Sequence, residues 1–480
     1  MRSKLQKFAD FANALLPHEA DYLLSVQRFE DGDKRRLLLQ VSANCRKITG
    51  FEPYDQEIDK RKYSSLKAWI EEKLGAVDVD REYEWLTRME VLIMTDAIPA
   101  QDEKELLRLF RSADATAYNF LKLYDLGRIF RHYLLVRLRY NAHDVVSQFL
   151  EKHRTSYEYA RLVNDKIHQA TSDIVAQYSR NNAESMRWEH WLSGVFFESA
   201  LDGYNRTLAL IRLIFIAVNY RRFDLLPDKF DHLEALIRQG VFYSRRILLN
   251  YYSQRLLSCA RAGDLAKAAY YGHLSVRARN NDYLYYVNNL ASVLLRAGEP
   301  AEALDVLRQA LQTAKNSQNF HNKIGHAAYL CLALNKSGLY RQADTHARAF
   351  FEAYRKEVFN HRWHLFFSAW LEAKLGQGQF AAMLKMAATH QLPERDAAYR
   401  KNASYTPVIP WLLALAAYKS GKSSLKALTE QFSADLLALY AQNGNAFPPA
   451  LHALLQSCAD AAPELLSGLK AVLWKKGVAV

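Results

Sequence analysis

The sequence predicts an all-α fold in which antiparallel helical hairpins follow one another, preceded by an irregular helical region. The clearest hairpin is residues 284–314, where apolar residues recur every three or four positions on both sides of Gly298. Pro300 lies at the start of the second helix, where its missing N–H removes no hydrogen bond. The low content of Gly (18) and Pro (11) also favours helices over a turn-rich β fold.

A repeating architecture also suits the length and charge of the chain. With 480 residues, the chain exceeds the usual size of one compact core, whereas a repeat can grow because each unit contacts only its neighbours. The formal net charge of +13 favours partners such as nucleic acid, anionic lipid or acidic proteins. A solvated basic surface without a specific ligand explains the same charge.

The N-terminal region has helical periodicity but no visible repeat. Apolar spacing predicts an opening helix that stops near Pro17, and turn residues such as Asp31-Gly32-Asp33 separate the helices that follow. These helices include residues 19–29, 34–48, 65–74, 102–110 and 157–178. Lys60-Arg61-Lys62 is a basic cluster that a solvated turn explains more simply than a phosphate site. Polar residues at 179–182 mark a boundary, so we predict an irregular helical region over residues 1–180.

Beyond this boundary the chain becomes periodic. Five predicted turns share a basic residue, a spacer and a glycine, at intervals of 35 to 45 residues: Arg261-Ala262-Gly263, Arg296-Ala297-Gly298, Lys336-Ser337-Gly338, Lys374-Leu375-Gly376 and Lys419-Ser420-Gly421. Alanine follows five residues after each of the first four glycines, at Ala268, Ala303, Ala343 and Ala381. A small residue at this position would let the two helices of each hairpin approach closely.

These turns lie in a stretch, residues 249–388, that resembles tetratricopeptide (TPR) repeats. One hairpin follows the family's order of large and small residues most fully, with Leu290, Ala291, Leu294, Gly298, Ala303, Leu307 and Ala310. Residues 330–343 fit nearly as well, whereas Arg255 stands where the family has a large apolar residue. The resemblance implies a TPR-like α-solenoid, a right-handed superhelix of antiparallel helical hairpins. We therefore predict a repeat array over residues 181–445 and C-terminal capping helices over residues 446–480.

No motif in the sequence indicates a reaction, a metal site or a cofactor. There is no Gly-rich phosphate loop, GxSxG elbow or HExxH sequence. His361 and His364 lie three residues apart without a suggestive carboxylate or cysteine partner, and helix capping explains Asp78 and Asp80 better than acid–base work. The four cysteines are widely spaced, as expected of core residues in a reducing compartment. We expect a cytoplasmic protein without a secretory signal, a membrane span, a catalytic site or a cofactor.

Four basic residues of the turns are the best candidates for a binding function: Arg261, Arg296, Lys336 and Lys419. In a TPR-like array, the first helix of each hairpin lines the concave surface, and stacked cations there suit carboxylate or phosphate groups. The helix dipole favours cations in a last turn whatever the function. The predicted partner-binding residues are Asn250, Arg261, Tyr285, Asn288, Ser292, Arg296, Asn335 and Lys336.

These residues lead us to expect a non-catalytic scaffold or adaptor that binds an acidic peptide or protein in its concave groove. A helical repeat protein that binds nucleic acid through its basic surface is the first alternative. A regulatory receptor that senses a peptide is the second, although residues 1–120 contain no convincing DNA-binding helix-turn-helix.

Overall fold

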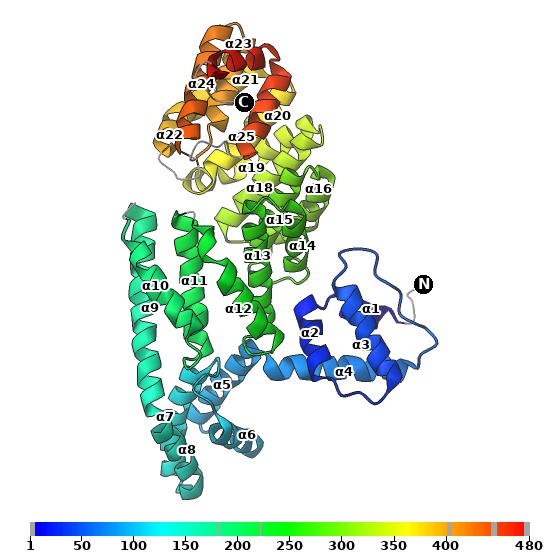
Figure 1. Cartoon of the computed structure of the whole chain (residues 1–480), viewed down its shortest axis with the longest axis vertical. Coiled ribbons are helices and arrows are strands. Elements are labelled where there is room, and N and C mark those ends of the chain that lie inside the picture. The colour runs from blue at the N-terminus through cyan, green and yellow to red at the C-terminus, as the bar shows by residue number, and fades with distance from the viewer. Residues whose placement is uncertain (1–4, 181–182, 221, 401–404, 443–448, 475–480) are drawn as a thin grey trace. The chain divides into compact units, whose positions relative to one another are not determined.

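The chain is all-helical, as predicted. The computed structural model describes residues 5–180, 183–220, 222–400, 405–442 and 449–474, and no strand occurs within these ranges (Figure 1). Packing of the Cα trace divides the chain into two compact units, residues 1–255 and 256–480, each of which is described by itself. The three regions predicted from the sequence divide the chain differently and stay a prediction. None of the helices in the described ranges combines the length and apolarity needed to cross a membrane.

The first unit contains twelve complete α-helices and two 3-10 helices within its described residues. Their bounds are α1 Gln6–Asn13, α2 Pro17–Val26, α3 Gly32–Cys45, α4 Lys60–Val77, α5 Val79–Met94, α6 Ala100–Ser112, α7 Phe120–Val136, α8 Tyr140–Lys152, α9 Arg154–Arg180, η1 Ala183–Trp188, α10 Glu189–Phe197, α11 Gly203–Tyr220, η2 Phe223–Leu225 and α12 Pro227–Arg238; α13, Arg245–Arg261, begins in this unit.

Two features hold parts of this unit together. A buried apolar cluster unites α5, α6, α7 and α8 around aromatic rings such as Phe120 and Phe130, which are fully buried. Elsewhere, the buried carboxylate of Glu19 on α2 accepts hydrogen bonds from Tyr243 Oη at 2.7 Å and Arg245 Nε at 2.8 Å. One carboxylate therefore links two segments of this unit that lie more than 220 residues apart in the sequence.

The described part of the second unit is also helical. Its helices after α13 are α14 Leu265–Ser275, α15 Tyr283–Ala297, α16 Pro300–Gln309, α17 Leu311–Asn316, α18 Phe320–Lys336, α19 Tyr340–Asn360, α20 Trp363–Gly376, α21 Phe380–His390, α22 Leu392–Tyr399, α23 Val408–Lys419, α24 Leu425–Gln442, α25 Pro449–Ala461 and α26 Glu464–Trp474.

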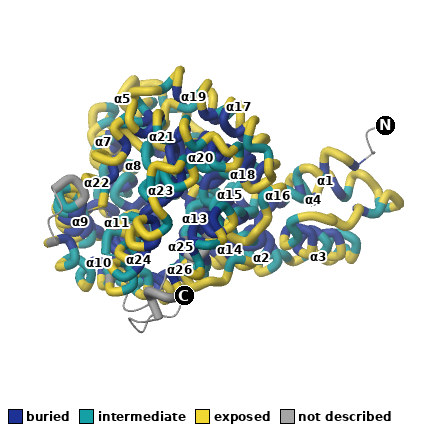
Figure 2. Tube along the Cα trace, turned by 90° about the horizontal axis from the view of Figure 1, so that it is seen from above, coloured by how far each residue is buried: buried dark blue, intermediate teal, exposed yellow. Residues whose placement is uncertain are grey.

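Successive hairpins of the second unit pack in a regular way. The first helix of one hairpin contacts the first helix of the next, so that α15, α18, α20 and α23 form a continuous row. The second helices α16, α19 and α21 pack on this row, and each of them also contacts the first helix that follows it. The first helices are therefore buried along much of their length, whereas α19 carries many exposed residues (Figure 2).

The turn glycines follow the predicted register except in the fourth hairpin. Gly263, Gly298, Gly338 and Gly421 have positive φ, a backbone conformation that favours glycine. In the fourth turn the positive-φ residue is Gly378 and not Gly376, so the predicted register there is wrong by two residues. A Cβ on Gly376 would lie 2.3 Å from the Tyr340 ring, which explains why this position is also glycine.

The shifted register changes the residue that fills the hairpin contact. Ala268, Ala303 and Ala343 are fully buried, as their predicted position between two helices requires. Ala381 is exposed, and the buried residue five positions after Gly378 is Met383. The fourth hairpin therefore packs around a long flexible side chain where the other three use a methyl group.

Candidate functional site

The predicted partner-binding residues lie on the first helices of consecutive hairpins. Tyr285, Asn288, Ser292 and Arg296 belong to α15, and Asn335 and Lys336 belong to α18, which packs against α15. Arg261 ends α13 in the same unit, whereas Asn250 belongs to the other unit and its Nδ2 donates to the carbonyl of Arg246 at 3.0 Å. Tyr285 and Ser292 are half-buried, and the three basic residues are exposed.

The two asparagines of the second unit connect neighbouring hairpins. Asn288 is 2 % exposed and its Nδ2 donates to the carbonyl of Asn322 at 2.9 Å. Asn335 is 5 % exposed and donates in the same way to Ala369 at 2.8 Å. Both bonds join one first helix to the next and span 34 residues of sequence. Their side chains therefore face the interior of the row of helices.

Arg296 combines an internal contact with an exposed cation. Its Nη2 donates to the carbonyl of Ala260, in the last turn of α13, at 2.9 Å. A cation at this place is favoured by the negative end of the helix dipole and satisfies a carbonyl that the helix leaves unpaired. Because a guanidinium has five N–H donors, most of its hydrogen-bonding capacity remains.

Lys336 lies in the electrostatic field of a carboxylate that the sequence analysis missed. Glu372 on α20 is partly buried, and burial raises its pKa to about 7, while the charge of Lys336 acts in the opposite direction. A carboxyl group with this pKa changes charge near neutral pH. Nothing in the local sequence distinguishes Glu372 from an ordinary surface glutamate, because its partner comes from another hairpin.

The remaining turn cations are engaged within the protein. Lys374 is buried, and its Nζ lies 2.8 Å from Oδ1 of Asp344. The same carboxylate accepts hydrogen bonds from Trp370 Nε1 at 2.6 Å and Arg348 Nη2 at 2.9 Å. The sequence does contain a signal for Asp344. In the two preceding hairpins, the residue after the alanine that lies five positions beyond the turn glycine is apolar, Ala269 and Leu304, whereas here it is an aspartate. Lys419 lies 3.9 Å from a carboxylate oxygen of Glu464.

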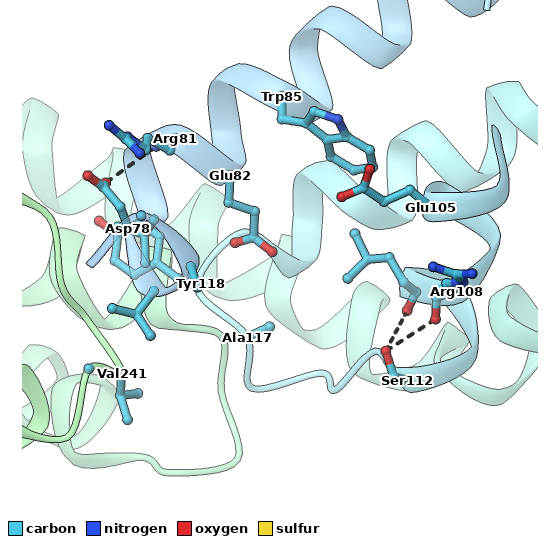
Figure 3. Close-up of a pocket in the computed structure, with 16 residues that line it drawn as sticks. Asp78, Arg81, Glu82, Trp85, Glu105, Arg108, Ser112, Ala117, Tyr118 and Val241 are labelled. Carbon is cyan, nitrogen blue, oxygen red and sulfur yellow. Dashed lines mark hydrogen bonds between the residues drawn. The ribbon is translucent and has the colours of Figure 1, made fainter. Parts of the chain in front are cut away.

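A cavity of about 650 Å³ in the first unit offers a second candidate site (Figure 3). It is lined by residues from the α4–α5 junction, from α6 and from the segment before α7, and carries the acidic Asp78, Glu82 and Glu105 together with the basic Arg81 and Arg108. Charges of both signs therefore surround the same space, and no single sign is concentrated there.

Two of these carboxylates have a local structural task. Asp78 caps α5 by accepting from the backbone N–H of Asp80 at 3.0 Å and of Arg81 at 3.3 Å, which confirms the capping role predicted for it. Glu82 Oε2 accepts from Asn119 Nδ2 at 2.8 Å. Burial raises the pKa of Asp78 above its usual range. The cavity does not favour one class of ligand.

Metal binding and thiol chemistry depend on the histidines, carboxylates and cysteines of the described ranges. No cluster of three or more histidine, cysteine, aspartate or glutamate residues is arranged there to hold a metal ion. His364 Nε2 lies 3.3 Å from Oδ1 of Asp396, which is an ordinary side-chain pair. No disulfide joins the four cysteines, which all lie within the described ranges. Burial raises the pKa of the Cys331 thiol, and it raises that of Cys458 to about 12.

No protein-family model matches the sequence, and no curated protein is significantly similar to it. The resemblance to TPR repeats therefore depends only on the residues of this chain.

Proposed function

We propose that this protein is a non-catalytic scaffold or adaptor that binds an acidic peptide or protein segment. In this proposal the hairpins of the second unit form a right-handed, TPR-like superhelix, and the first helices α15, α18 and α20 line its concave face. The exposed basic residues at the ends of these helices recognise carboxylate groups of the partner.

The observation that carries the proposal is the state of Arg296 and Lys336. Both are exposed, and both lie in the last turn of the first helix of consecutive hairpins. The bond from Arg296 to Ala260 fixes one edge of the guanidinium and leaves donors for a ligand. A side chain that is held in place before binding loses less conformational freedom in the complex, which favours affinity.

Glu372 gives this groove a dependence on pH. Above its pKa of about 7, the Glu372 carboxylate offsets part of the positive charge of Lys336. Below that pKa the carboxyl group is neutral, so the groove becomes more attractive to an acidic ligand. We therefore expect tighter binding of an acidic peptide at about pH 6 than at about pH 8.

Nucleic acid is the second candidate partner, and the net charge of +13 is the observation that favours it. The two candidates differ in how the charge is used. Peptide recognition depends on Arg296 and Lys336 at fixed positions, whereas nucleic-acid binding through a basic surface depends on total charge and falls steeply with salt.

The test compares two fluorescently labelled probes, a Glu- and Leu-rich peptide and a DNA duplex, by fluorescence anisotropy. The variant is Arg296→Glu with Lys336→Glu, and the charge-matched control in the same unit is Lys385→Glu with Lys426→Glu, both exposed. Each charge-assisted hydrogen bond contributes about 1.5–3 kcal/mol, so the first variant should weaken peptide binding by about a hundredfold or more, and the control should not.

A different pattern would contradict the proposal. Equal losses from both double variants, with DNA bound more tightly than the peptide and with a steep salt dependence, would indicate a diffuse basic surface. A second control, Lys60→Glu with Arg61→Glu, reports on the basic cluster of the first unit. Unchanged peptide binding by the Arg296 and Lys336 variant would leave these residues as helix-end cations.

A further inference from the structure

A cavity of about 340 Å³ lies between α17, α18 and α19 of the second unit. Its volume falls in the range of about 300–1,000 Å³ that is typical of small-molecule sites. Most of its wall is apolar, with Ala314, Phe350 and Tyr354 among the lining residues. Its charged lining residues, Lys315 and Lys323, are both basic, and none of the lining residues is acidic.

Lys323 is an unusual residue for this position. The residue as a whole is only 6 % exposed, and within the described part of the chain no ion pair or hydrogen bond of its ammonium group is found. Nζ itself is not among the fully buried polar atoms without a partner, so it remains accessible from the cavity. Its printed contacts are with aromatic rings, at 5.5 Å from the centroid of Phe320 and 4.8 Å from that of Tyr354. A buried charge normally has a partner of opposite sign, because desolvation penalises the unpaired ion.

The position of Lys323 in α18 adds a second penalty. The helix begins at Phe320, with Asn319 as its N-cap, so Lys323 lies in the first turn. Cations are disfavoured there, since the N-terminal end of the helix dipole is positive and favours anions instead. The helix position thus disfavours this ammonium group, and an anion in the cavity would supply the partner that it lacks within the described ranges.

Two further features mark the cavity as a site. Nε2 of His346, which lines it, is buried and has no hydrogen-bond partner in the described ranges, so a polar group of a ligand would satisfy it. Tyr354 has φ −133° and ψ 35°, a non-helical conformation inside α19. Since α19 contains neither proline nor glycine, the kink has no sequence cause of the usual kind. It occurs at the residue whose ring contacts Lys323.

The histidines of the cavity add no charge at neutral pH. His326 Nε2 donates to the carbonyl of Leu307 at 2.9 Å, and burial lowers its pKa to about 4. Burial also lowers the pKa of His346, against a contact with the backbone of Ala327. The positive charge of the wall therefore comes from the two lysines.

We propose that this cavity binds a small organic monocarboxylate, with the carboxylate against the ammonium group of Lys323 and an apolar body between Ala314, Phe350 and Tyr354. One buried ammonium group in an apolar wall matches one negative charge on an apolar ligand. Inorganic phosphate is a poorer match, because it carries more charge and no apolar body. This site is independent of the proposed peptide groove, which uses the ends of the first helices.

The test measures ligand-observed saturation-transfer NMR titrations of the full chain with two acids, hexanoate and phenylbutyrate, and with their neutral amides. We expect both acids to bind with dissociation constants of about 0.1–1 mM and each amide to bind at least about tenfold more weakly. Lys323→Met keeps the length of the side chain and removes the charge, and it should abolish the preference for the acid. Lys385→Met, at an exposed lysine outside the cavity, is the matched control and should bind like the parent.

A second variant keeps the test decisive if Lys323→Met does not fold. Ala349→Phe fills the cavity from an exposed position of its wall and leaves Lys323 in place, and it should weaken the binding of acids and amides alike. The proposal is overturned if no acid binds better than its amide, if Lys323→Met keeps the preference, or if inorganic phosphate displaces the acids.

Discussion

Nζ of Lys374 lies 2.8 Å from Oδ1 of Asp344, and both side chains are buried between α19 and α20. Burial raises the pKa of Asp344, but hydrogen bonds from Lys374 and Trp370 outweigh it and hold the pKa below its usual range. The pair therefore joins the third hairpin to the fourth through the basic residue of a predicted turn.

Removing one member of this pair should be costly. Asp344→Ala leaves the Lys374 ammonium group buried without its carboxylate, and we expect a loss of about 3–5 kcal/mol in the free energy of unfolding. Asp305→Ala, at an exposed aspartate on α16, is the control and should change stability by less than about 0.5 kcal/mol. Urea denaturation followed by circular dichroism measures the stability of both variants. A loss from Asp344→Ala as small as that from the control would mean that Lys374 reaches solvent or another partner.

Glu372 should make the protein less stable as the pH rises. Its pKa is about 7 in the folded chain and 4.5 as a reference, so the folded state binds more protons between these values. The stability is fully present below about pH 4.5 and is lost as the pH rises through about 7. Glu372→Gln should therefore stabilise the protein by about 1–3 kcal/mol at alkaline pH, the upper figure being reduced by hydration of the partly buried carboxylate.

The pH series itself is the control for this prediction. The gain from Glu372→Gln should shrink as the pH falls, because the native glutamate is then protonated as well. Thermal or urea unfolding of the variant and the parent at several pH values measures it. A gain that is the same at every pH would assign the effect to packing.

In the first unit, the pKa of Glu234 is shifted in the opposite direction, below its usual value. The neighbouring imidazole of His18, whose Nε2 lies 3.3 Å from Oε1 of Glu234, lowers this pKa to about 2 against the effect of burial, and Tyr251 Oη donates a hydrogen bond at 2.5 Å. Glu234→Gln should therefore cost about 1–3 kcal/mol at neutral pH. The native advantage is present above about pH 4.5 and is lost as the pH falls towards 2, so the two proteins should converge in acid. Glu71→Gln, at an exposed position, should show no such convergence.

The corrected register of the fourth hairpin can be tested with two leucines. Ala303 is fully buried between two helices, so Ala303→Leu should overpack the contact and cost about 1–3 kcal/mol. Ala381 holds the corresponding place in the sequence register but is exposed, so Ala381→Leu should be almost neutral. If both variants lowered the melting temperature equally, Ala381 would occupy the helix–helix contact, as the sequence register predicts.

The sequence predicts the local part of this structure well. Apolar periodicity and the turn glycine Gly298 are enough to define α15 and α16, because both signals act within one hairpin. The error at Gly376 arose because two glycines stand close together, and only the backbone conformation distinguishes the turn glycine from the one that makes room for Tyr340.

The candidate sites were harder to predict for a physical reason. Arg296, Lys336 and Lys374 occupy similar places in the sequence, yet their environments depend on Ala260, Glu372 and Asp344, which belong to neighbouring helices. Lys323 looks like any lysine near the start of a helix, and the Tyr354 ring that lies 4.8 Å from its ammonium group belongs to another helix. Such properties arise from contacts between helices, which periodicity does not report.

The row α15, α18, α20 and α23 has a consequence for how the second unit folds. The helices α18 and α20 each touch the first helix before them and the first helix after them, and the hydrogen bonds of Asn288 and Asn335 close loops of only 34 residues. Contacts between such near neighbours carry a small entropy of loop closure, so folding can nucleate at any hairpin and spread in both directions. Amide hydrogen exchange should then be slowest in α18 and α20, which have first helices on both sides, and faster towards α24.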